Sequence, residues 1–249
     1  MKGTRPLDND EIRLVSVCFD GAFEARNCGL FMLGVSTGGR ISELLSLQIG
    51  DVYQNGRAVT DLLFDKSVVK GGEVSRAVPI NRDGRRAIDS LIAWHRDRYK
   101  DTKANRPLFP SRNGRGEKPM SRRTAHDVLK NAFEAAGLNG HLATHSLRKS
   151  FAQRLYDRTS DIFAVQEMLG HKSVSTTQKY LGVNYANIKE ALEEISLESE
   201  LDIPHLLGGS LKKEKDETLI LELALRGYDL SKPLREDAEE PTAEIVKVG

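Results

Sequence analysis

Apolar residues recur at helical spacing along the first fifty residues. The segment Leu7–Glu11 has the composition of a capped helix start, with carboxylates near the positive end of the helix dipole. The apolar positions that follow it at helical spacing are Ile12, Leu14, Val15, Cys18 and Phe19. A second helix is predicted from about Phe23 to Val35 and stops at Gly38-Gly39, and a short third helix follows Arg40.

The pattern changes after residue 50. Three short segments rich in β-branched residues, with glycines at the turns, predict a small three-stranded antiparallel sheet. These segments are Ala58–Phe64, Lys66–Val69 and Val74–Ile80. Helical spacing then resumes in Asp83–Tyr99, Ser121–Ala136, His145–Arg158, Ile162–Leu169, Val174–Tyr180 and Asn184–Ser199. The predicted fold class is therefore α+β, mainly α.

The elements up to about residue 200 are sufficient for one domain, and we predict that residues 1–200 form it. Residues 201–249 are predicted to be an acidic C-terminal extension. Gly208–Asp216 has the composition of a linker, whereas Thr218–Tyr228 is apolar enough to pack against another surface. Residues 229–249 offer little to bury, so we expect the extension to be partly mobile.

The composition is ordinary for a soluble globular protein, with 39% hydrophobic and 29% charged residues in 249. No apolar run approaches the length of a membrane span, and the first residues lack the apolar core of a signal peptide. Cys18 and Cys28 are the only cysteines, and they indicate neither a disulfide framework nor a metal site. We therefore expect a cytoplasmic protein without a membrane partner.

The net charge of +1 conceals two regions of opposite sign. Residues 191–249 hold 7 basic and 15 acidic residues, a balance of −8, so the totals of 37 and 36 leave 30 and 21, or +9, for residues 1–190. A basic body can neutralise the phosphates of nucleic acid. Solvated Lys and Arg are also common on proteins that bind no DNA, so charge alone is a modest argument.

Two arginines are candidates for binding a phosphodiester. Attack on a phosphodiester raises negative charge on its nonbridging oxygens, and arginine stays charged and can hold two oxygens with its planar fork. Arg40 follows two glycines and opens a predicted helix. Arg148 lies three residues after His145, so the two share one face of a helix. Taken alone, either arginine is more simply explained as a solvated side chain.

Three further side chains could transfer protons or contact the phosphate. His145 can accept a proton beside Arg148, and Lys70, at a Gly-Gly turn, can protonate a leaving oxygen. His171 follows Leu169-Gly170, a predicted helix stop, where it could bind the phosphate or cap the helix carbonyls. Each has a simpler explanation when it is considered singly: a packed histidine, a solvated lysine, a helix cap.

Tyr180 is the candidate nucleophile. A phenol, with a reference pKa of about 10, needs a base and a cationic field before it attacks readily. Most tyrosines only pack their rings, and Tyr185 is a nearby rival with a less informative context. The argument depends on the order and spacing of all six residues.

Together these motifs resemble the catalytic domain of the tyrosine recombinases, the phage integrase family. The resemblance runs from about Leu7 to Ile195 and is carried by Thr37-Gly-Gly-Arg40-Ile-Ser-Glu-Leu, Lys70-Gly-Gly, His145-Ser-Leu-Arg148, Leu169-Gly-His171 and Thr176-Thr-Gln-Lys-Tyr180.

The resemblance implies a role for each residue. Arg40 and Arg148 would clamp the scissile phosphate, with a hydrogen bond from His171. Lys70 would be the general acid for the departing 5′ hydroxyl, and His145 would take the proton of Tyr180. Tyr180 would become linked to a DNA 3′ phosphate until a 5′ hydroxyl reverses the step, with no metal, nucleotide or other cofactor.

The same resemblance implies double-stranded DNA as a partner and a homo-oligomer, a tetramer on DNA. Family members usually carry a helical core-binding domain ahead of the catalytic one, and this chain begins at the catalytic domain. A separate core-binding domain or protein is therefore a further expected partner. In the family a C-terminal helix often docks on a neighbouring protomer, and Asn184–Ser199 or Thr218–Tyr228 could do so here. The acidic tail could instead shield the basic groove. Unchanged DNA affinity after deletion of residues 205–249 would remove the shielding hypothesis.

Three other functions compete with a site-specific recombinase. A DNA-binding remnant or accessory protein would keep the fold and turn over poorly, but the complete set of six residues argues against decay. A relaxing topoisomerase would share the chemistry, although the context of His171 and the small size favour a recombinase. A metal nuclease is the weakest alternative, because the sequence has no H-E-x-x-H motif or carboxylate cluster.

Overall fold

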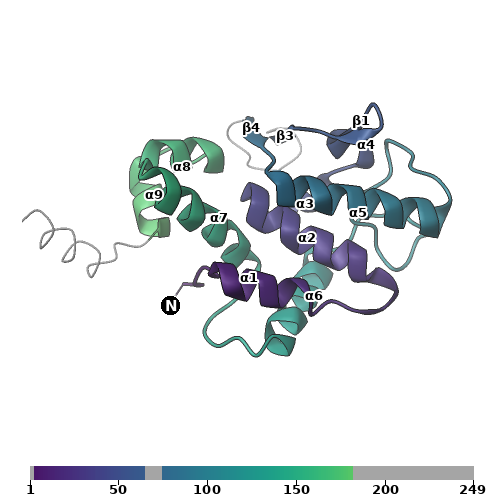
Figure 1. Ribbon diagram of the computed structural model, residues 1–249, viewed down its shortest axis with the longest axis horizontal. Helices are drawn as coiled ribbons and strands as arrows, with labels where there is room; N and C mark the ends of the chain where they lie inside the picture. Colours follow the sequence, from purple (N-terminus) through teal and green to yellow (C-terminus); the bar gives the residue numbers. More distant parts are fainter. Residues whose placement is uncertain (1–2, 65–74, 182–249) are drawn as a thin grey trace, which may run out of the picture. The chain divides into compact units, whose positions relative to one another are not determined.

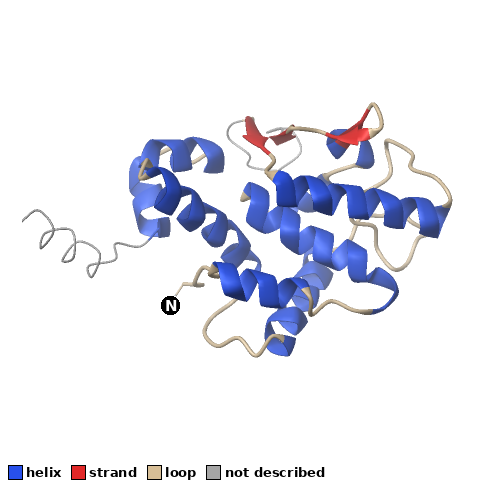
Figure 2. Ribbon diagram, viewed as in Figure 1, coloured by secondary structure: helices blue, strands red, loops and turns tan. Residues whose placement is uncertain are grey.

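The computed structural model describes residues 3–64 and 75–181, which all belong to one compact unit (Figure 1). This part of the chain is mainly helical, with short strands at one edge (Figure 2). The helices are α1 (Asn9–Ser16), the 3-10 helix η1 (Gly21–Phe23), α2 (Glu24–Thr37), α3 (Ile41–Ser46), α4 (Ile49–Val52), α5 (Arg82–Tyr99), α6 (Arg122–Ala135), α7 (Thr144–Thr159), α8 (Ile162–Leu169) and α9 (Val174–Leu181). The prediction of an α+β, mainly α fold is confirmed.

Local capping explains where several helices begin. At the start of α1, the Asp8 carboxylate accepts from the backbone N–H of Glu11 (2.8 Å), and the Glu11 carboxylate accepts from that of Asp8 (3.1 Å). Asn81 and Ser121 cap α5 and α6 in the same way with one side-chain oxygen each. The predicted helices among the described residues lie within about two residues of these bounds; Asn184–Ser199 lies outside them.

The strands differ from the predicted three-stranded sheet. Strand β1 (Tyr53–Gln54) pairs with β2 (Arg57–Ala58), and β3 (Asp61–Phe64) pairs with β4 (Arg76–Pro79), so the described residues form two antiparallel two-stranded sheets. The predicted strand Ala58–Phe64 is divided in two, because Ala58 pairs with β1 whereas Asp61–Phe64 pairs with β4. The predicted strand Lys66–Val69 lies outside the described residues.

Helix α2 is the centre of the core. It packs against α5 on one side and α7 on another, and its residues Leu30, Phe31 and Leu33 are fully buried. A Cβ added at Gly34 would lie 2.6 Å from Leu147 Cδ1, so this glycine allows the close approach of α7 to α2. The packing places the start of α7 beside the end of α2, where the candidate arginines lie.

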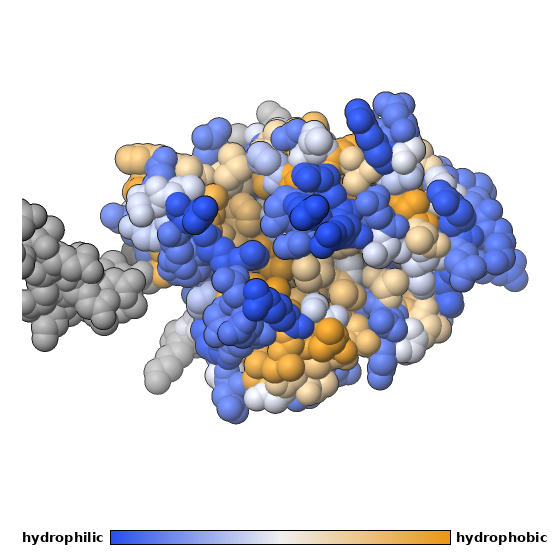
Figure 3. Space-filling model, in the orientation of Figure 1, coloured by the Kyte–Doolittle hydropathy of each residue, from blue (hydrophilic) through white to orange (hydrophobic). Residues whose placement is uncertain are grey.

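Helices α7, α8 and α9 pack together at one side of the domain (Figure 1). Val165 and Leu169 of α8 are fully buried against Ala152 of α7, and Tyr180 of α9 packs on the same cluster. On the face drawn in Figure 3, polar residues dominate, with an apolar patch over α1 and α6. No helix in the described part of the chain is long and apolar enough to cross a bilayer.

Candidate active site

A two-glycine turn places Arg40 at the start of α3. Gly38 ends α2 with a left-handed backbone, φ 62°, and a Cβ there would lie 2.4 Å from Phe151 Cδ1. A Cβ at Gly39 would lie 2.9 Å from atoms of Leu44 and Phe64. Only glycine fits both positions, and the turn directs the following residue, Arg40, to the N-cap of α3.

A buried carboxylate holds the Arg40 side chain. Arg40, 42% exposed, donates from Nη1 to Glu43 Oε1 (2.7 Å), and its backbone N–H donates to Glu43 Oε2 (2.6 Å). Arg76 donates to the same two oxygens, from Nη1 (3.0 Å) and Nη2 (2.8 Å). Burial alone would raise the pKa of the Glu43 carboxyl, but the hydrogen bonds and charges of Arg76 and Arg40 outweigh it and lower the pKa to about 2.

Arg148 is pinned between two chain segments. Its Nη1 donates to the carbonyl of Gly38 (2.6 Å) and its Nη2 to the carbonyl of Leu169 (2.5 Å), and the residue is only 3% exposed. Burial, with the neighbouring charges of Arg40 and Arg76, lowers the pKa of the guanidinium to about 10. Arg148 therefore remains a cation at neutral pH and lies in a region that already concentrates positive charge.

The two candidate histidines are neutral at pH 7. His145 lies in the first turn of α7, and burial together with Arg148 and Arg40 lowers its imidazole pKa. His171 follows Gly170, whose left-handed backbone ends α8, and its Nδ1 lies 3.0 Å from the hydroxyl oxygen of the buried Thr177. Burial and the charges of Arg148 and Arg40 lower the pKa of His171 to about 4. A neutral imidazole can accept a proton or a hydrogen bond.

The Tyr180 phenol lies among these groups. Its ring centroid is 5.3 Å from that of His171, with the rings at 74°, and Lys149 Nζ lies 5.5 Å from the Tyr180 centroid. Burial raises the pKa of the Tyr180 hydroxyl, and Arg148 and Arg40 oppose that shift. Arg148 approaches the hydroxyl without reaching hydrogen-bond geometry, and the buried oxygen has no partner among the described residues.

Five of the six residues expected from the sequence thus lie near one another, from α3, α7, the α8–α9 turn and α9. The sixth, Lys70, lies outside the described residues, as does the rival tyrosine, Tyr185. Two site residues were missed by the sequence analysis. Glu43 had a signal, a carboxylate three residues after Arg40 in the first turn of a helix, whereas Arg76 had none, because its partner lies 33 positions away.

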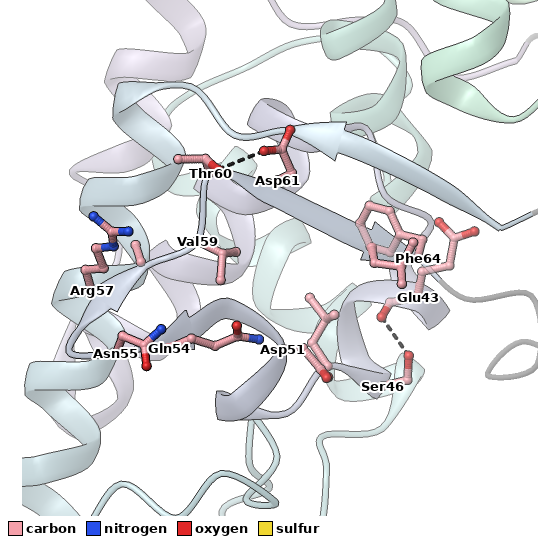
Figure 4. A pocket seen from close by; sticks show the side chains of 13 residues that line it. Glu43, Ser46, Asp51, Gln54, Asn55, Arg57, Val59, Thr60, Asp61 and Phe64 are labelled. Carbon is pink, nitrogen blue, oxygen red and sulfur yellow. Dashed lines mark hydrogen bonds between the residues drawn. The ribbon is translucent and has the colours of Figure 1, made fainter.

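A cavity of about 630 Å³ lies beside this cluster, between α3, α4 and the strands (Figure 4). Glu43 and Ser46 line one end, where Ser46 Oγ donates to the carbonyl of Glu43 (2.7 Å), and Asn55 and Arg57 line the other. None of the five described candidate residues lines it. The candidate chemistry therefore lies outside this cavity. Residues 3–64 and 75–181 contain no group of three or more potential metal ligands.

Known proteins share this sequence and fold. Residues 6–187 match the phage integrase family. Over 172 residues the chain is 37% identical to tyrosine recombinase XerD of Mycobacterium tuberculosis (strain ATCC 25618 / H37Rv), covering 69% of this chain and 52% of the relative. It is 34% identical over 188 residues to tyrosine recombinase XerC of Xanthomonas campestris pv. campestris (strain B100), covering 75% and 54%. The chain thus spans about half the length of these curated relatives.

Solved structures agree with the sequence matches. The XerH site-specific recombinase bound to palindromic difH substrate, a post-cleavage complex, superposes with a TM-score of 0.59 at 28% identity, over 76% of this chain and 52% of that one. The XerA recombinase superposes with a TM-score of 0.60 at 23% identity, over 76% and 65%, which shows the fold alone. With a family match over most of its length and a site of arginines, imidazoles and a phenol, this chain belongs to the phage integrase family.

Proposed function

We propose that this chain is the catalytic domain of a site-specific DNA recombinase or integrase, which cleaves and rejoins DNA strands by transesterification through Tyr180. The observation that supports the proposal most directly is the position of the buried Tyr180 hydroxyl, in the combined field of Arg148 and Arg40 and beside the His171 ring. Membership of the phage integrase family supports the same chemistry. An accessory role without turnover is less favoured, because the described part of the site keeps its catalytic residue types.

In the proposed reaction, the Tyr180 oxygen attacks the scissile phosphorus and the bond to the 5′ oxygen breaks, leaving a 3′-phosphotyrosine. Arg40 and Arg148 neutralise the charge that grows on the nonbridging oxygens. Neutral His145 accepts the phenolic proton, and His171 hydrogen-bonds the phosphate. Lys70 protonates the departing 5′ oxygen. A 5′ hydroxyl of a partner strand then reverses these steps, so the reaction conserves the phosphodiester bond and consumes no cofactor.

The proposed partners follow from the charge and from the relatives. The surplus of positive charge in residues 1–190 suits double-stranded DNA, and the XerH relative was solved on its DNA substrate. We also propose a homo-oligomer, a tetramer on DNA, and a core-binding domain or protein that completes the grip on the duplex. The proposed site of action is the cytoplasm.

A covalent-trapping experiment tests the proposal. Duplexes that bind the protein would be selected from a random-sequence pool and resynthesised with a nick at successive positions, so that a cleaved short strand diffuses away and the adduct persists. We expect a covalent protein–DNA adduct on denaturing gels with the wild type. The Tyr180→Phe variant should lose it, because it lacks the attacking oxygen.

Tyr185→Phe is the matched control and should form the adduct as the wild type does. An adduct that survives Tyr180→Phe and disappears in Tyr185→Phe would move the nucleophile. Specific binding without an adduct at any nick position would instead favour the accessory role. Addition of a chelator should leave the yield of adduct unchanged.

A further inference from the structure

We infer that Arg76 is a positioning residue for strand cleavage: it ties the Arg40 side of the site to the His171 side and does not itself contact the DNA. This inference rests on the proposed function, since it concerns the rate of that reaction. Arg76 lies on β4, outside every motif that marks the site in the sequence.

Arg76 binds two elements at once. Its Nη1 and Nη2 form a bidentate pair with the Glu43 carboxylate of α3, which in turn holds Arg40. Its Nε donates to the carbonyl of Met168 in the last turn of α8 (2.9 Å). The adjacent carbonyl, that of Leu169, is bound by Arg148. The end of α8, which leads through Gly170 into His171, is therefore fixed by Arg76 and Arg148 together.

The Arg76 side chain is enclosed. It is 5% exposed, its Cζ lies 4.6 Å from the centroid of the Phe64 ring, and a Cβ added at Gly170 would lie 3.2 Å from Arg76 Cδ. A guanidinium so covered, with three of its donors committed to protein oxygens, has little surface left for a phosphate. Its effect on the reaction must therefore act through Glu43 and the α8 terminus.

The loss of Arg76 should disturb both contacts. The Glu43 carboxylate would remain buried and, among the described residues, would keep only Arg40 as a charged partner. It would then draw the Arg40 guanidinium away from a phosphate. The Met168 carbonyl would lose its donor, which would loosen the turn before His171. Lysine at this position restores the charge. Its ammonium is a single point of contact, so it cannot form both the bidentate pair with Glu43 and the hydrogen bond to the Met168 carbonyl.

The test compares Arg76→Met, Arg76→Lys and Val78→Ala in the full chain. Val78 is fully buried on the same strand and lies in the apolar core, so its truncation controls for a general loss of packing. The single-turnover rate of adduct formation would be measured on the nicked duplex at saturating DNA, at a temperature where circular dichroism shows each variant to be folded. The affinity for intact duplex would be measured separately.

We expect Arg76→Met to cleave at least tenfold more slowly than Val78→Ala, Arg76→Lys to fall between them, and DNA affinity to change less than threefold. Cleavage by both Arg76 variants at the Val78→Ala rate, or a loss confined to affinity, would overturn the inference. If Arg76→Met does not fold, the comparison of Arg76→Lys with Val78→Ala decides by the same criterion. Absence of an adduct in the wild type would refute the proposed function itself.

Discussion

The two candidate phosphate-binding arginines are held in different ways. The Arg40 side chain is 42% exposed and forms a salt bridge with Glu43, and Glu43 forms a second salt bridge with Arg76. Arg148 is buried, and two main-chain carbonyls depend on it. Catalysis and folding should therefore be separable at Arg40 and coupled at Arg148.

Replacing Arg40 by Ala should reduce cleavage strongly and stability little. The loss of one preorganised cation at the phosphate corresponds to about 3 kcal/mol of transition-state stabilisation, or roughly a hundredfold in rate. Single-turnover cleavage and urea unfolding would be measured on the same preparation.

Arg148→Ala should lose cleavage and also unfold at lower urea, because the Gly38 and Leu169 carbonyls lose their donors. Equal stability losses in both variants would contradict this distinction.

At the residue scale, the sequence predicted the chemical groups but not how they are held. Arg40, His145, Arg148, His171 and Tyr180 stand in short motifs, so their types and order were readable. The clamp of Arg76 on Glu43 joins a strand to a helix 33 positions away, and no local pattern records such a pair. The burial of Arg148 was equally invisible, since a helix carries an arginine on its solvated face far more often.

At the scale of elements, the turn between α2 and α3 is tightly constrained at Gly38. Gly38 has both a left-handed backbone and no room for a side chain, and its carbonyl accepts from Arg148. A distortion of this turn would move Arg40 and the acceptor of Arg148 together.

Gly38→Ala should therefore destabilise the domain more than Gly21→Ala does. Both glycines have positive φ, 62° and 71°, but a Cβ at Gly21 would meet no atom within 4 Å. The shared backbone strain is about 1–2 kcal/mol, and the clash with Phe151 should add roughly 1–3 kcal/mol at Gly38 alone. Urea unfolding of the two variants gives the difference directly. Indistinguishable midpoints would mean that Phe151 moves aside freely.

Element boundaries were predictable where a local cap fixes them. Asp8 starts α1, and Gly170 ends α8 where the sequence placed its stop. The sheet was less predictable, because β2 and β3 are close in the sequence but pair with different strands, β1 and β4. The short helix α4 itself was missed, since its four residues are too few to show a helical period.

At the scale of the whole domain, buried groups should make the fold sensitive to acid. Burial lowers the imidazole pKa of the core residue His95, of His145 and of His171, the last to about 4. A histidine with a lowered folded pKa binds its proton more readily in the unfolded chain. The stability that these neutral histidines contribute is therefore fully present above about pH 6.5 and declines as the pH falls toward 4.

Glu43 adds to this sensitivity at lower pH, since its carboxyl pKa of about 2 is lower than that of an unfolded glutamate. Its contribution is present above about pH 4.5 and is lost as the pH falls toward 2.

The histidines are tested at higher pH. Urea unfolding at pH 7.5, 6.0 and 5.0 should show a progressive fall in the free energy of unfolding. The His171→Gln variant should show a shallower fall, and a profile unchanged from the wild type would mean that His171 is not held neutral.

Under the proposed function, the buried hydroxyl of Tyr180 is also relevant to the binding of DNA. An enclosed polar oxygen without a mate among the described residues raises the free energy of the unbound state. A phosphate bound between Arg40 and Arg148 would bring oxygens near that hydroxyl, which has no hydrogen-bond partner among the described residues. Part of the free energy of binding a duplex would then come from providing polar contacts for the Tyr180 hydroxyl. Binding of the scissile phosphate and alignment of the attacking Tyr180 oxygen would therefore occur together.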